Sequence, residues 1–276
     1  MTAFVSNIPP VARRFAAGLL LALALSAALA ARGDAEAADP LGPGAKSEPN
    51  CPTPKNAPSY LGCQVFGHVT GFQISTGDGT SIHRVPEDGR IVAWRVQLGT
   101  PEDTALEYFQ QNLPDATFDT YGTNPVAGLS ILKPQDNGKF KLTKSSPIVN
   151  LTNSLGENPI FTLRNPLRVR AGTIVGLTTP TWVTNFAGAN KAKSAPLSDE
   201  NVWRASRKPE RCTTEVTDDG MIDDSNLTRK SHPHTKKGSI RRYGCVYRGA
   251  QILYTAYFVP DGGNKDGKGG GGGGKG

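Results

Sequence analysis

The residues that most often build metal centres and nucleophilic active sites are scarce in this chain. Histidine and cysteine number four each among 276 residues, no C-x-x-C pair occurs, and no Gly-x-Ser-x-Gly motif is present. These absences remove the usual zinc-binding spacings and the nucleophile elbow of the α/β-hydrolases. We therefore predict no catalytic residue, no metal site and no cofactor. A serine triad built on His68 or His83 stays open, because triad partners need not be close in sequence.

Two segments offer the most plausible metal ligands. His232-Pro-His234 presents two imidazoles, but five cationic residues stand within a few positions and would repel a divalent ion. The segment from Asp218 to Asp224 concentrates four carboxylates, as some calcium loops do, but its spacing is not that of an EF-hand. A solvated acidic loop is the simpler interpretation.

Long apolar runs are absent after the N-terminus. There, a pair of arginines precedes an Ala- and Leu-rich run from Phe15 to Leu29, and small-x-small sites follow it as far as residue 37. These features are typical of a secretory signal peptide, which we assign to residues 1–37. The alternative is a membrane anchor, because the segment Phe15–Ala31, about seventeen residues long, is at the lower bound for spanning a bilayer. We expect cleavage and a secreted product that retains no transmembrane segment.

The cysteines agree with export. An even number of them outside the reducing cytosol predicts disulfides. Three connectivities are possible among Cys51, Cys63, Cys212 and Cys245. The simplest pairing joins cysteines that are neighbours in the sequence, Cys51 with Cys63 and Cys212 with Cys245. In the loop-entropy model, each closure stabilises the fold by roughly 3 to 4 kcal/mol.

Methionine is rare and glycine and proline are abundant, with 2, 32 and 21 residues, which favours β structure. We divide the exported part into a flexible leader at 38–50, one β domain at 51–260 and a disordered Gly/Lys tail at 261–276. Apolar residues alternate with polar ones over 92–98 and again over 161–169. In the second run Pro166 indicates an edge strand or a bulge.

Turn signals separate the remaining strands, and Asn137-Gly138 predicts a tight hairpin. One segment differs: residues 101–113 have helical spacing, with Thr100 as the expected N-cap and Pro101 at the first helical position. We predict an all-β fold, an antiparallel β-sandwich of jelly-roll-like form with one short inserted helix, and a monomer. The other expected strands are 64–74, 128–133, 139–143, 147–152, 173–179, 243–248 and 250–259.

The alternating runs also carry a resemblance. Gly89-Arg-Ile-Val-Ala-Trp94-Arg-Val and Pro166-Leu-Arg-Val-Arg-Ala-Gly172-Thr-Ile-Val-Gly-Leu177 are similar to paired motifs in uncharacterised exported β-sandwich proteins of high-GC Gram-positive bacteria. In those proteins an acidic residue is usual where Thr173 stands in this chain. The resemblance implies a jelly-roll-like sandwich, and it implies no activity and no catalytic residues.

The strongest local feature is a cationic segment, residues 229–242, which has six cations, two histidines and no acid. It lies within the loop that Cys212 and Cys245 would close, downstream of an acidic run. We predict that it binds an anionic surface; a solvated loop neutralised by the acidic run is the alternative. No aromatic residue interrupts it, so specific nucleic-acid recognition is not expected. The proposed anion-binding residues are Arg229, Lys230, Lys236, Lys237, Arg241 and Arg242.

Trp182 and Trp203 flank a long polar loop and are the candidates for stacking on a glycan, with core packing as the alternative. Together these features predict a secreted, non-catalytic protein that binds an anionic polymer, a glycan or a membrane surface. Two other functions stay open. One is an extracytoplasmic hydrolase of a glycan or an ester, which a His hydrogen-bonded to a Ser, or a cleft with two carboxylates of perturbed pKa, would favour. The other is a structural envelope protein.

Overall fold

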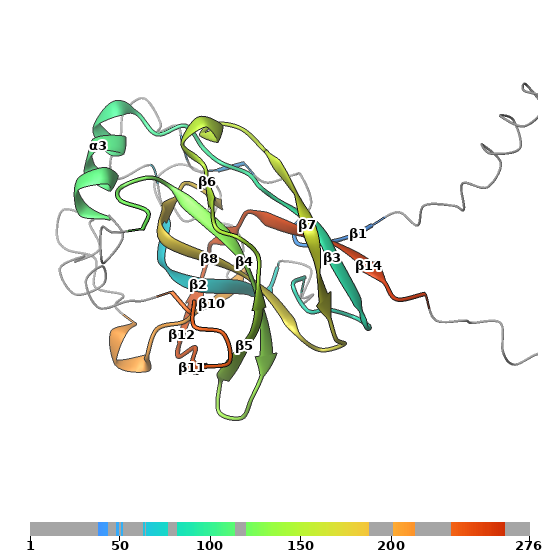
Figure 1. Ribbon diagram of the computed structural model, residues 1–276. Helices are drawn as coiled ribbons and strands as arrows, with labels where there is room; N and C mark the ends of the chain where they lie inside the picture. The colour runs from blue at the N-terminus through green and yellow to red at the C-terminus, as the bar shows by residue number, and fades with distance from the viewer. Residues whose placement is uncertain are drawn as a thin grey trace, which may run out of the picture. The chain divides into compact units, whose positions relative to one another are not determined.

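The computed structural model describes residues 38–43, 48–49, 51, 63, 65–76, 82–113, 120–187, 201–212 and 233–262. They form two antiparallel sheets, a separate short pair of strands and one α-helix (Figure 1). The all-β sandwich predicted from the sequence is confirmed. Residues 38–276 form one compact unit that contains both sheets and both disulfides.

The smaller sheet has four strands in the order β1-β14-β3-β7. Their bounds are β1 (Asp39–Leu41), β14 (Tyr254–Pro260), β3 (Gly89–Val96) and β7 (Ile160–Val169). β7 is an edge strand and carries Pro166, as predicted. An edge position tolerates proline because the missing N–H would face solvent.

The larger sheet has eight strands and curls, so that its far strands β11 and β12 both lie near the lower left of the view (Figure 1). In order across the sheet the strands are β11 (Ile240–Arg242), β5 (Lys139–Ser145), β4 (Val126–Pro134), β8 (Ile174–Val183), β2 (Phe66–Ser75), β10 (Val202–Ala205) and β12 (Cys245–Arg248), and β6 (Val149–Asn150) pairs with β4. The short pair is β9 (Phe186–Ala187) with β13 (Gln251–Ile252), and the helices are α3 (Asp103–Asn112) and the 3-10 turns η1 (Thr152–Ser154) and η2 (Pro209–Arg211).

The larger sheet carries an apolar cluster on each of its two faces. One face packs with the smaller sheet in the main core, which joins Leu129 and Leu177 to Ile91 and Trp94. The other face holds a second apolar cluster inside the curl, because neighbouring residues of a strand point to opposite sides. The members of this inner cluster are Phe72, Leu132, Phe140, Leu142, Ile174 and Tyr243.

Two local sequence signals are confirmed. Asn137 and Gly138, with φ of 55° and 67°, form the turn that joins β4 to β5. Both angles lie in the left-handed region that a two-residue type I′ hairpin turn requires, and Asn-Gly accepts it most easily. The predicted helix is also present, but it starts at Asp103 with Glu102 as its N-cap. The expected N-cap, Thr100, and the proline after it precede the helix.

The strand predictions missed four elements. The segment assigned to the flexible leader includes β1, which pairs in register with β14, so the leader interpretation is wrong for Asp39–Leu41. β9, β10 and β11 were also missed, because runs of two to four residues are too short to show a period. At the other end, Asp261 still bonds the fold through its N–H to Asp88 O at 2.9 Å. The predicted signal peptide, residues 1–37, and residues 263–276 of the predicted tail lie outside the described residues.

Candidate anion-binding face

Three neighbouring strands place four cations on one surface. Lys133 of β4 lies directly opposite Lys141 of β5, and Lys139 of β5 lies directly opposite Arg242 of β11. Directly opposed residues of antiparallel strands share a face, and residues two apart on one strand do as well. All four side chains are exposed. We call Lys133, Lys139, Lys141 and Arg242 the cationic face.

Alternation along β5 explains why these cations point outward. Between and beyond the lysines, Phe140 and Leu142 are buried in the inner cluster, with Phe140 5.2 Å from Phe72 and 4.9 Å from Tyr243 between ring centroids. Burying two such side chains stabilises the strand by about 3 to 5 kcal/mol. The register is therefore fixed by the core, and a one-residue slip would bury the lysines.

The cationic face carries no neutralising ion pair within the described residues. Only two ion pairs occur there, Arg90–Asp261 at 3.5 Å and Lys208–Glu210 at 3.8 Å, and neither involves this face. One acid, Asp136, stands in the hairpin turn and is exposed. Like charges set directly opposite each other destabilise a strand pair by up to about 1 kcal/mol. No carboxylate of the described residues offsets this repulsion by an ion pair, and the acidic run at 218–224 lies outside them.

The six predicted anion-binding residues do not all lie on one surface of the described structure. Arg242 belongs to the cationic face, and Lys236 and Lys237 are exposed on the turn that leads into β11. Arg241 lies opposite Phe140 on the other side of β11, half buried, and burial lowers its pKa. It therefore does not share the outward surface of Arg242, because neighbouring residues of a strand point to opposite sides. Arg229 and Lys230 lie outside the described residues.

Three residues of the cationic face are not among the anion-binding residues predicted from the sequence: Lys133, Lys139 and Lys141. The signal was available, because the two β5 lysines alternate with Phe140 and Leu142 after a hairpin turn. Such a pattern indicates a half-buried strand with cations on its solvent side. Lys133 lies on the same surface because of the register of the β4–β5 hairpin. Arg242 lies there because β11, about a hundred residues further along the chain, pairs with β5.

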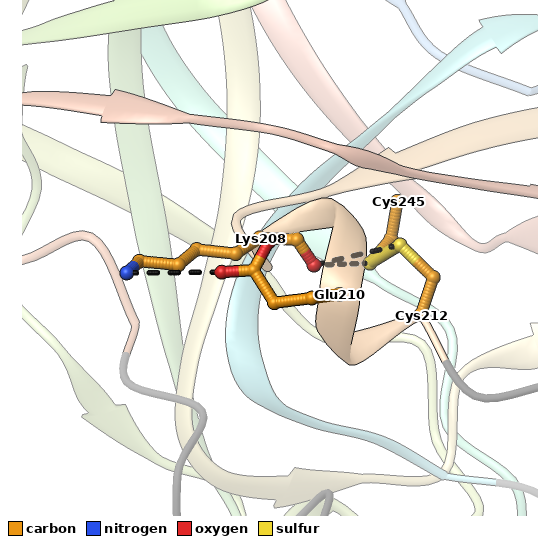
Figure 2. Close-up of polar contacts among 4 residues, drawn as sticks. All are labelled: Lys208, Glu210, Cys212 and Cys245. Atoms are coloured by element: carbon orange, nitrogen blue, oxygen red, sulfur yellow. Dashed lines mark hydrogen bonds and ion pairs between the residues drawn. A yellow bond between two sulfur atoms is a disulfide. The ribbon is translucent and has the colours of Figure 1, made fainter.

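The disulfide pairing predicted from the sequence is confirmed: Cys51 bonds to Cys63, and Cys212 to Cys245. The second bridge ties η2 to the start of β12, as Figure 2 shows. Both sulfur atoms lie near the carbonyl oxygen of Lys208, at 3.6 and 3.4 Å. β11, with Arg242, falls inside the loop that this bridge closes. Two disulfides fit an oxidising compartment.

Both candidate stacking tryptophans are buried, which confirms the core-packing alternative and overturns the glycan-stacking role. Trp182 is fully buried against Phe109 of α3, and its Nε1–H donates to Thr123 O at 3.0 Å. Trp203 is 7% exposed and stacks on Tyr247 at 4.3 Å between ring centroids. Neither offers an open ring face to a sugar.

A His–Ser contact does occur, between His234 and Ser239, with 3.0 Å from Nε2 to Oγ. The serine hydroxyl donates to Lys236 O at 2.5 Å, and the Tyr243 hydroxyl lies 3.1 Å from His234 Nδ1. Burial raises the pKa of Tyr243 and lowers that of His234 to about 4, so the imidazole is neutral and the phenol keeps its proton. Because the serine hydroxyl donates to Lys236 O, His234 Nε2–H donates to the serine, and Nδ1 accepts a hydrogen bond from the Tyr243 hydroxyl.

This polarity is opposite to that of a catalytic dyad, in which the histidine accepts the serine proton. The backbone N–H groups nearby are also engaged, since Gly238 donates to Leu142 O and Ser239 to Lys236 O. They leave no oxyanion hole at Ser239. His234, whose ring nitrogens both have partners, is likewise a poor metal ligand. His232 lies outside the described residues.

The triad candidates do not assemble either. His83 is fully buried: its Nδ1 accepts from Gln73 N–H at 3.2 Å, and Nε2 lies 3.3 Å from Tyr254 O. The ring stacks on Tyr254 at 4.1 Å, and burial lowers its pKa to about 4. With both nitrogens used by the backbone, His83 has none for a serine. His68 is buried at the bulge of β2, with a φ of 52°.

One solvent-open groove, of about 390 Å³, lies away from the cationic face, between the β3 exit at Gly99 and the turn at Gly156. Its walls include two carboxylates, Glu48 and Glu157, and no aromatic side chain. The two carboxylates repel an anion, and the groove offers no aromatic ring on which a sugar could stack. The groove therefore does not compete with the cationic face.

Within the described residues no helix has the length and apolar character needed to cross a bilayer. No group of three or more His, Cys, Asp or Glu side chains gathers there at metal-binding distance. None of the family models, curated proteins and solved structures compared with this chain matches it.

Proposed function

We propose that this protein is exported and binds an anionic polymer or surface through the cationic face. The observation that carries the proposal is the register of β4, β5 and β11, which sets Lys133 against Lys141 and Lys139 against Arg242. Export is supported by the N-terminal apolar run after two arginines and by the two disulfides.

The energetics favour an anion in this place. Each opposed pair repels, and a phosphate, sulfate or carboxylate lying across it accepts charge-assisted hydrogen bonds from both members. Binding thus relieves repulsion as well as adding attraction. Lys236 and Lys237, on the turn before β11, add positive potential that attracts a polyanion over a Debye length of about 8 Å.

The cationic face offers no aromatic platform for base stacking. Its outward residues on β4, β5 and β11 include no aromatic side chain. Stacking on aromatic rings supplies much of the affinity of single-stranded nucleic-acid binders. Recognition is therefore of charge and its spacing, with lysines about 7 Å apart along a strand and opposed pairs about 5 Å apart across it.

Chromatography on immobilised heparin tests the proposal with a matched pair of variants. The test variant is K133Q/K139Q/K141Q, and the control is R164Q/R168Q/R170Q, which removes three exposed cations of β7 and the turn after it. Both lower the net charge equally. We expect the test variant to elute at much lower salt than the native chain, and the control to elute close to it.

Two results would contradict the proposal. Equal shifts for both variants would mean that only net charge matters and that no site exists. Elution of the native chain at the salt expected for an unrelated protein of the same charge would mean that heparin has no site on it. Circular dichroism and intact disulfides would show that each variant is folded.

A further inference from the structure

An apolar side chain stands beside the cations at the edge of the cationic face, on its outermost strand. Ile240 of β11 lies directly opposite Lys141, and it is two residues from Arg242 on the same side of the strand. Its side chain is 55% exposed, and it is one of three exposed large hydrophobic residues in the described part of the chain. Lys133 stands in the same cross-strand row, beyond Lys141.

A soluble polyanion gains no favourable contact from this isoleucine. Phosphate, sulfate and carboxylate groups bind through charge, and an apolar side chain among their cations only displaces water that solvates them. A phospholipid bilayer satisfies both kinds of group at once. Its headgroup phosphates meet the lysine and arginine side chains, while an aliphatic side chain enters the boundary between headgroups and acyl chains.

The position of these residues fits a flat partner. β5 and β11 form the end of the larger sheet, and the β4–β5 hairpin extends at the bottom of the view (Figure 1). Lys139, next to the hairpin turn, and Arg242 opposite it stand toward that end. The long aliphatic stems of lysine and arginine let their charged ends adapt to the plane of the headgroups.

We infer that the cationic face docks on a bilayer rich in anionic phospholipid, with Ile240 inserted into the interface. The inference rests on the proposed function, since it names the surface that the same cations would meet. Each cation near such a surface strengthens binding about fivefold, and removing the isoleucine side chain from the interface weakens it about five- to tenfold.

The test uses the compact unit, residues 38–276, so that the apolar run at 15–29 does not itself bind lipid. Cosedimentation is measured with vesicles of phosphatidylcholine mixed with phosphatidylglycerol, and with vesicles of phosphatidylcholine alone. I240T is compared with I160T, because Ile160 is 59% exposed on β7 of the other sheet and threonine keeps the branched shape suited to a strand. Heparin affinity is measured in parallel.

We expect the unit to bind the anionic vesicles and not the neutral ones. I240T should weaken vesicle binding about five- to tenfold and leave heparin affinity unchanged, while I160T changes neither. Equal vesicle binding by I240T and I160T would overturn the membrane inference and leave the proposed function standing, with a soluble polyanion as the ligand. If K133Q/K139Q/K141Q kept full heparin affinity, the proposed function itself would fail.

A second variant keeps the inference testable if I240T does not fold. The three native tryptophans, Trp94, Trp182 and Trp203, are at most 7% exposed. I240W therefore adds the one tryptophan emission that lipid can change. We expect its emission to shift to shorter wavelength on addition of anionic vesicles. An unchanged spectrum at saturating vesicle concentration would overturn insertion at this position.

Discussion

Lys139 and Arg242 lie directly opposite each other on β5 and β11, although they are about a hundred residues apart in the sequence. No carboxylate pairs with either within the described residues, and Lys133 and Lys141 repeat the arrangement one step along the sheet. Two rows of opposed cations on one surface destabilise the free protein slightly. They also define where an anion would bind.

Replacing one cation by an acid should separate stability from binding. K139E sets a carboxylate against Arg242 and turns repulsion into attraction, so the free energy of unfolding should rise by about 0.5 to 1 kcal/mol while heparin affinity falls. Urea denaturation measures the first and salt elution the second. K139Q is the control, with a smaller gain. A K139E chain no more stable than K139Q would show that the two side chains do not interact.

Stability should fall as the pH is lowered from about 6.5 toward 4. Burial holds the pKa of both His83 and His234 at about 4 in the folded state, against about 6.5 when unfolded. Between these values the unfolded chain binds more protons, so stability present above pH 6.5 is lost as the pH falls. For His83 alone the loss is about 3 kcal/mol at pH 4.

Urea denaturation at several pH values between 7 and 4 checks this dependence. Histidine ring signals that titrate in the folded protein near pH 6.5 would contradict it directly, since they would show that the imidazoles are solvated. Carboxylates that titrate below pH 5 also contribute, so the range from 6.5 to 5 is the informative one.

The two disulfides should differ in their contribution. Cys212–Cys245 closes a loop of 33 residues and Cys51–Cys63 one of 12. In the loop-entropy model, removal of the first costs about 4 kcal/mol and of the second about 3 kcal/mol. Denaturation of the C212S/C245S and C51S/C63S proteins gives both values. A larger loss for the shorter loop would mean that native contacts, and not chain entropy, set the order.

The contact of Phe109 with Trp182 should be the main interaction that holds α3 against the rest of the fold. Phe109 is 3% exposed and lies 5.2 Å from Trp182 between ring centroids. F109A should destabilise the protein by about 3 to 4 kcal/mol, since it leaves a cavity beside a fully buried tryptophan. L106A, at a partly buried position of the same helix, should cost about 1 kcal/mol. Alanine is the best helix former, so neither loss can come from helix propensity. Similar losses for both variants would show that the contact with Trp182 is not what holds the helix.

Local patterns predicted much of this fold. Asn137-Gly138 predicted the β4–β5 turn because its backbone angles depend on those two residues alone. Alternation predicted β3 and β7, and helical spacing predicted α3 to within two residues of its start. Each of these signals lies within a dozen residues of chain. The pairing of cysteines close in sequence was also correct.

The candidate site was only partly predictable. Composition indicated a cationic segment, but Arg241 and Arg242 were grouped until the strand at Ile240–Arg242 placed them on opposite faces. The polar residues around Trp203 suggest an exposed side chain. The pairing of β10 with β2 and β12 buries it instead. Register between distant strands decides these outcomes, and no short window of sequence contains it.

The salt dependence of heparin binding tests whether the cationic face is the anion-binding site. Affinity of the native chain is measured over a range of NaCl concentrations and compared with that of K133Q/K139Q/K141Q. If the cationic face is the site, the native affinity falls steeply with salt, and the variant binds weakly with a clearly shallower slope. The same slope and affinity for both proteins would show that the anion binds elsewhere, and the account would be wrong.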